Sequence, residues 1–334
     1  MKTDLKSIKI VPLSSMILLA LFFIACGGDG GEGGVSPSAG ISYTGLTTQA
    51  IIDETNAEGL AAGAYEGGHT GSAIGGMSVA QTEASGNIGY CRMLKVSQAL
   101  EGSLRQVDLM SRSDGTFIGA IYTETGAVYG DCGGSGSYTI SVNDETGDFS
   151  GSLSFSSYCE YGVTISGSVS FSGQVDVVTG DLLRFSFTFT CLTGTSGSDS
   201  VTLSGNISCD LTVHPATMTM SMLVRDNSTG KVYWVRDYTM TVTEGPTYVD
   251  VELSGRYYDP DYGYAIVTTS TPFRIYGGDD WPSDGVLVVT GNTGIAGGST
   301  MARLTALSSS TYQIEADTDG DGSYDWDSGV LNWS

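Results

Sequence analysis

Residues 138–156 read YTISVNDETGDFSGSLSFS, and this stretch decides the fold class. Apolar residues alternate with Ser, Thr and Gly on both sides of a Thr-Gly-Asp turn, which is the period of a half-buried β-strand. Folding the stretch about this turn sets Val142 opposite Phe149 and Tyr138 opposite Leu153. Apolar side chains then share one face, so we predict an antiparallel hairpin that is apolar on one side and polar on the other.

The alternation continues to the C-terminus. Folding the next hairpin about Gly180 sets Val175 opposite Phe185 and Phe171 opposite Phe189. Further alternating runs cover 199–213, 216–225, 231–243, 247–256, 263–276, 285–290, 300–307, 310–316 and 324–333. The pattern predicts a mainly β fold, an antiparallel up-and-down meander of roughly a dozen strands. Such a sheet should curl or close to hide its edges, and the sequence leaves a curled sheet, a barrel and a sandwich open.

Two segments before the β region have helical spacing. Apolar residues recur every three or four positions in 48–65 and again in 92–110, with Gly/Ser-rich sequence between them. We therefore expect two short helices. They would form an N-terminal segment, 47–112, that packs on the β domain of residues 113–334.

The N-terminus has the features of a bacterial export signal. Lysines precede the apolar run 17–24, which is too short to span a bilayer but suits a signal-peptide core. The sequence Phe-Ile-Ala-Cys that ends at Cys26 resembles a lipobox, in which the thiol receives diacylglycerol after cleavage. Residues 1–25 are thus predicted to be a lipoprotein signal peptide, and Cys26 the lipidation site.

Residues 26–46 begin with a Gly-rich acidic stretch that has nothing to bury, as expected of a flexible tether. Gly27, directly after the lipidated cysteine, is similar to the residue choice that sorts lipoproteins to the outer membrane. The whole chain resembles uncharacterised Gram-negative lipoproteins that share a lipobox, a helical start, a β body and an Asp-rich last hairpin. The resemblance implies a lipid anchor in the outer membrane, at its periplasmic face or on the cell surface, and no particular function.

The chain is strongly acidic, with a formal net charge of −23. Residues 1–25 hold three Lys and one Asp, so the remainder has 11 basic and 36 acidic residues and a net charge of −25. This charge argues against nucleic acid and anionic lipid head groups as partners. The expected partners are the membrane, through the lipid anchor, and an envelope protein or a glycan.

Catalytic motifs are scarce. The sequence has no G-x-S-x-G motif, no P-loop and no C-x-x-C, and its two histidines are His69 and His214. The paired carboxylates of Asp259 and Asp261 would suit a glycosidase-like cleft, although Pro260 between them is more typical of a turn.

The leading hypothesis is therefore a structural or binding module rather than an enzyme. The alternatives are a carboxylate-dependent enzyme that acts on glycans and a barrel that carries an apolar ligand or lipid. Aromatic residues such as Trp281 and Trp326 could stack on sugar rings.

An exported chain meets an oxidising compartment, and the register of the 138–156 hairpin sets Cys132 opposite Cys159. We predict a disulfide between them. Cys191 and Cys209 both lie on the apolar face and make a poorer second pair, while buried free thiols are the alternative for all these cysteines.

The last motif is the Asp-rich stretch 317–325, which reads DTDGDGSYD. Its alternating carboxylates around glycines resemble the start of an EF-hand calcium loop and the calcium loops of extracellular repeats. The predicted Ca²⁺ ligands are the side chains of Asp317, Asp319, Asp321 and Asp325 and the carbonyl of Ser323. Ser328 replaces the last glutamate of an EF-hand and a strand follows, so a polar hairpin tip is an equally good interpretation.

Overall fold

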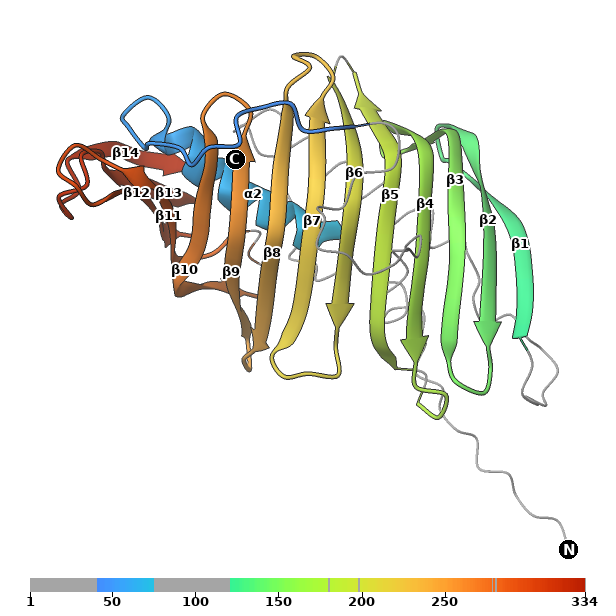
Figure 1. Cartoon of the computed structure of the whole chain (residues 1–334). Coiled ribbons are helices and arrows are strands. Elements are labelled where there is room, and N and C mark those ends of the chain that lie inside the picture. Colours follow the sequence, from blue (N-terminus) through green and yellow to red (C-terminus); the bar gives the residue numbers. More distant parts are fainter. Residues whose placement is uncertain are drawn as a thin grey trace, which may run out of the picture.

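A computed structural model describes residues 41–74 and 121–333, apart from Gly180, Ser198, Gly278 and Asp280. Within these residues, fourteen antiparallel strands form one sheet whose spatial order is the order of the chain (Figure 1). The strands are β1 (Ile121–Tyr129), β2 (Gly133–Asn143), β3 (Asp148–Glu160), β4 (Val163–Val175), β5 (Leu182–Ser196), β6 (Asp199–Asp210), β7 (Ala216–Asp226), β8 (Val232–Glu244), β9 (Tyr248–Asp259), β10 (Gly263–Tyr276), β11 (Asp284–Thr293), β12 (Ser299–Ser308), β13 (Thr311–Asp317) and β14 (Trp326–Asn332). The predicted meander is confirmed. The sheet is open because β1 and β14 do not pair, so it is neither a closed barrel nor a sandwich.

The predicted register of the first hairpin is confirmed. In the β2–β3 pair, Val142 lies opposite Phe149 and Tyr138 opposite Leu153. Their side chains belong to the buried face of the sheet, which we call the inner face. The other, polar face is the outer face.

The predicted register of the second hairpin is wrong by two residues. Phe171 lies opposite Phe187 instead of Phe189. The turn itself explains the shift, because the Asp176 carboxylate accepts the N–H groups of Val178 and Thr179 and ends β4 at Val175. Val178 is therefore a turn residue, and its apolar side chain is 89% exposed. From Ser168 to Gln174 the shift is two, which keeps these side chains on their predicted face.

Among the described residues there is one helix, α2 (Ala57–Ile74), instead of two. It begins later than the predicted 48–65 because the preceding segment is extended and bound to the sheet. The N–H of Ala50 donates to the carbonyl of Tyr264, and the N–H of Ile52 donates to the Thr300 hydroxyl. The second predicted helix, 92–110, lies outside the described residues.

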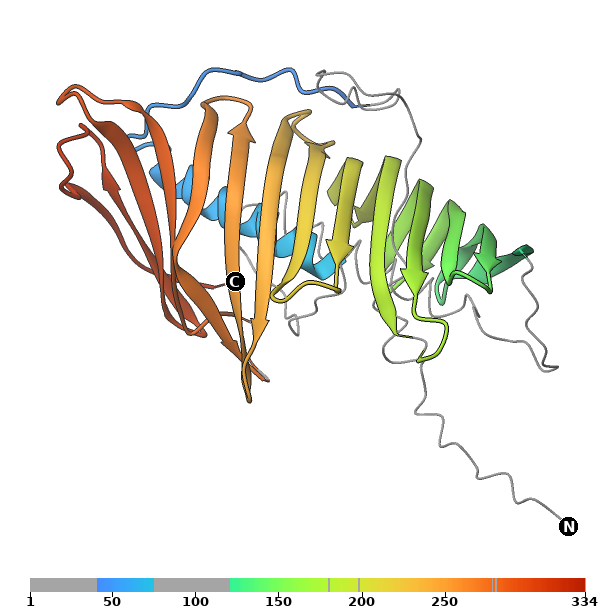
Figure 2. The same ribbon diagram turned by 60° about the horizontal axis from the view of Figure 1, so that its bottom comes forward.

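Helix α2 packs on the inner face of the sheet, against β8, β9, β11, β12 and β13 (Figures 1 and 2). A Cβ atom at Gly63 would lie 2.4 Å from the hydroxyl of Tyr257, so a glycine is needed for the helix to approach this closely. The segment before α2 crosses the ends of the strands to the outer face, where Tyr43 packs on Trp234. No helix in the part of the chain that the structure describes has both the length and the apolar character of a membrane span.

Candidate functional site

A row of hydroxyl side chains crosses the outer face of β1 to β7. Each member is the cross-strand partner of the next, and we call them together the hydroxyl row. Its members on these seven strands are Thr123, Ser141, Ser150, Ser172, Ser186, Ser208 and Thr219. The same cross-strand pairing continues beyond the groove to Thr239 of β8 and Ser254 of β9. Neighbouring strands lie about 4.8 Å apart, so the row extends over about 29 Å.

Side chains of the hydroxyl row line a shallow groove with a volume of about 810 Å³. Six of its seven members, from Ser141 to Thr219, line this outer-face groove. Charged side chains gather at one end of the groove, where Arg184 lies between Asp148 and Asp210 across the paired strands. The groove thus presents neutral hydroxyls beside apolar residues such as Phe149 and Phe185, with both signs of charge at one end.

Three hydroxyls in the middle of the row are available to a ligand. At its two ends, Thr123 bonds to Ser141 and Ser208 bonds to Thr219, each with an oxygen–oxygen distance of 2.8 Å. The central members have no hydrogen-bond partner among the described residues; they are Ser150, Ser172 and Ser186. A hydroxyl can donate and accept, so this part of the groove suits a ligand that does both.

The charged end of the groove is fixed by local contacts. Arg184 donates to the side-chain carbonyl of Gln174 at 2.7 Å. Hydrogen bonds from the Thr212 hydroxyl and N–H lower the pKa of Asp210. This carboxylate is therefore ionised at neutral pH.

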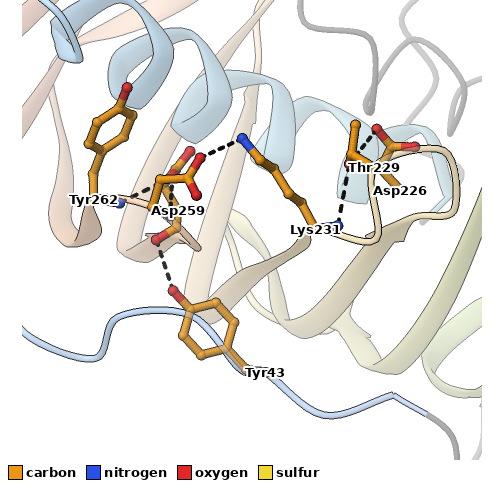
Figure 3. Close-up of polar contacts among 7 residues, drawn as sticks. Tyr43, Asp226, Thr229, Lys231, Asp259 and Tyr262 are labelled. Carbon is orange, nitrogen blue, oxygen red and sulfur yellow. Dashed lines mark hydrogen bonds and ion pairs between the residues drawn. The ribbon is translucent and has the colours of Figure 1, made fainter.

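Asp259 is the last residue of β9, and Asp261 lies in the turn that leads to β10. Figure 3 shows Asp259 with Tyr43, Lys231 and Tyr262 around it. The Asp259 carboxylate accepts the N–H groups of Asp261 and Tyr262, at 2.8 and 3.3 Å. Asp261 forms an ion pair with Lys231, and the Tyr43 hydroxyl donates to the Asp259 carbonyl at 2.8 Å. Burial raises the pKa of Asp259. These contacts build a turn and tie the N-terminal segment to it, which is the structural role that Pro260 indicated.

The Asp-rich loop between β13 and β14 brings three of its predicted ligands together. One carboxylate oxygen each from Asp317, Asp319 and Asp321 lies within 4.8 Å of the others. Asp317 is fully buried, and its two oxygens accept the N–H groups of Gly320 and Gly322 at 2.7 and 2.8 Å. Three clustered carboxylates could hold a metal ion, while these hydrogen bonds also make the turn.

The other two predicted ligands have different contacts. The N–H of Ser323 donates to Asp321. Asp325 accepts the N–H and the hydroxyl of Thr318, and these hydrogen bonds lower its pKa.

The predicted disulfide between Cys132 and Cys159 is confirmed, with Cα atoms 5.1 Å apart. It joins the end of β3 to the turn before β2. No disulfide links Cys191 to Cys209, and burial raises the pKa of the Cys209 thiol to about 12. The proposed lipidation site, Cys26, lies outside the described residues.

Of the two histidines, His214 lies exposed in the connection between β6 and β7. The side chain of His69 is outside the part of the chain that the structure describes. The hydroxyl row was not predicted from the sequence. Ser/Thr alternation indicated a polar face, but the alignment of hydroxyls across seven strands depends on every intervening register.

Comparisons with known proteins give no relative for this chain: no family model, no curated protein and no solved structure matches it.

Proposed function

We propose that the chain is a lipid-anchored protein of the bacterial outer membrane that binds a neutral glycan in the outer-face groove. The hydroxyl row carries this proposal. A sugar polymer presents hydroxyls that donate and accept, and the unpaired hydroxyls of the central row are their complement. The six members of the row that line the groove extend over about 24 Å, a length that suits an extended chain better than a small molecule. The net charge of −23 disfavours anionic glycans.

Removing two central hydroxyls should weaken glycan binding. We expect Ser150→Val/Ser172→Val to lose about tenfold in affinity, because two hydrogen bonds of about 0.5–1 kcal/mol each are lost. Binding of the purified full chain to a panel of immobilised neutral envelope polysaccharides measures this.

The matched control is Ser154→Val/Ser168→Val, a cross-strand pair on the same two strands and the same face but outside the groove. It should bind within about twofold of the wild type. Equal losses in the two variants, or no binding of any polysaccharide by the wild type, would contradict the proposal.

The anchor has its own test. Cys26→Ser should abolish incorporation of labelled palmitate and move the protein from the membrane to the soluble fraction, because stable attachment requires the acyl chains. Cys91→Ser, which removes a different cysteine, should leave labelling and fractionation unchanged. Palmitate labelling that persists in Cys26→Ser would refute the anchor.

We also propose that the Asp-rich loop binds Ca²⁺, with Asp317, Asp319 and Asp321 as its carboxylate ligands. Three carboxylates close together repel one another, so a cation should stabilise the C-terminal hairpin. With so few protein ligands we expect a dissociation constant of about 0.1–1 mM, in the range of extracellular calcium modules.

Calorimetric titration and thermal melting in millimolar Ca²⁺ test this site. The wild type should release or absorb heat and melt at a higher temperature, and Asp319→Ala/Asp321→Ala should do neither. Asp176→Ala, which changes a turn aspartate elsewhere in the sheet, should respond like the wild type. If the wild-type melting temperature does not change, the loop is only a turn.

A further inference from the structure

A small cavity lies between α2 and the C-terminal strands. It is on the inner face of the sheet, whereas the groove is on the outer face. Its volume is about 10 Å³, which is room for one group of the size of a water molecule. We call it the aromatic pocket. It is lined by Ala62, Tyr65, Glu66, Trp281, Leu304, Tyr312 and Trp333.

Aromatic rings make most of its walls. Trp333 stacks on Trp281 with ring centroids 5.2 Å apart and on Tyr312 at 4.3 Å. Tyr65 is tilted against the same indole at 5.2 Å. Ring faces attract cations, and the attraction grows when the cation is shielded from water.

One carboxylate completes the pocket. Glu66 as a residue is partly exposed, but its Oε2 atom is buried and has no hydrogen-bond partner. No Lys, Arg or His is among the residues that line the cavity. A buried carboxylate oxygen without a partner is costly, and a cation that enters the pocket would relieve that cost.

We infer that the aromatic pocket binds the head group of a small primary alkylammonium ion, with Glu66 as its counter-ion. An –NH₃⁺ group is close to water in size and fits the cavity, and one of its N–H donors can bond the free carboxylate oxygen. Calcium would need six to eight oxygen ligands, which one carboxylate among aromatic rings does not supply. This site lies apart from the groove, and its existence does not depend on glycan binding.

The pH dependence of binding follows from the burial of Glu66, which raises its pKa to about 8. Below pH 8 the carboxyl group is mostly neutral and must release a proton to pair with the cation. The affinity should therefore rise about tenfold per pH unit from 6 to 8 and level off above that. Burial also raises the pKa values of the nearby Tyr65 and Tyr312, which stay neutral in this range, and the remaining carboxylate, Glu58, lies exposed on α2.

The test is a titration of the full chain in detergent with butylammonium chloride at pH 8.5. Tryptophan fluorescence should change and saturate, because Trp281 and Trp333 line the site. Calorimetry at pH 7 in two buffers with different ionisation enthalpies should show release of one proton per bound amine. Butanol, which has the same chain without the charge, should not bind.

Glu66→Gln keeps the shape of the side chain without its charge, and its affinity should be at least tenfold lower and independent of pH. Glu58→Gln makes the same change at an exposed position of α2 and should bind like the wild type. Saturable binding that Glu66→Gln retains, binding by the wild type that does not vary between pH 6 and 8, or no binding at pH 8.5 would each overturn the inference.

Discussion

Phe187→Ala should lower the free energy of unfolding by about 3–5 kcal/mol. Phe187 is fully buried on the inner face, between Phe171 of β4 and Ile207 of β6. Truncation removes most of the apolar side chain and leaves a cavity that the two neighbouring strands cannot close without breaking their pairing. Urea unfolding followed by circular dichroism measures the loss.

Thr188→Ala is the control for this variant, because Thr188 is the next residue of the same strand and faces outward. It should cost less than about 1 kcal/mol. A loss in Phe187→Ala no larger than that of the control would mean that the inner face of β5 is not part of the core.

The Cys132→Ser/Cys159→Ser variant should be less stable than the wild type by about 3–4 kcal/mol on the chain-entropy model. The disulfide links residues 27 positions apart. Its removal raises the conformational entropy of the unfolded chain and so favours unfolding. The comparison uses urea unfolding of oxidised wild type and variant.

Reduced wild type is the internal control for the disulfide, and it should unfold at the same urea concentration as the variant. Peptide mapping without reduction should recover the two cysteines in one linked peptide. If reduction leaves the unfolding midpoint of the wild type unchanged, the disulfide does not constrain the unfolded chain.

Much of the fold could be predicted because β-sheet faces follow a period of two. The pattern around Phe149 predicted both a hairpin and its register, since a tight turn leaves few alternatives. The next hairpin was shifted because the carboxylate of Asp176 closes its turn early and leaves Val178 exposed. Strand-like residues in a turn cannot be recognised from alternation alone.

The candidate sites were less predictable than the strands. The hydroxyl row requires every register to be known, and several strands contain bulges, such as those at Ser157 and Cys191, that shift it. The aromatic pocket joins Glu66 to Trp333, which are far apart in the chain. By contrast, the three clustered aspartates are close in sequence, and their grouping was visible from their spacing.

The strictly sequential order of the strands has a consequence for how the chain folds. Each strand pairs only with strands next to it in sequence, so every hairpin closes a short loop and can form as soon as its second strand is available. The N-terminal segment is the exception, because Tyr43 bonds to Asp259 and Ile52 to Thr300 across more than 200 residues. A chain whose N-terminus emerges first can thus build the sheet strand by strand. Residues 41–74, however, cannot pack on the sheet until the last strands have formed. During that interval the apolar side of α2 remains uncovered, which is the stage at which a holding chaperone would be needed.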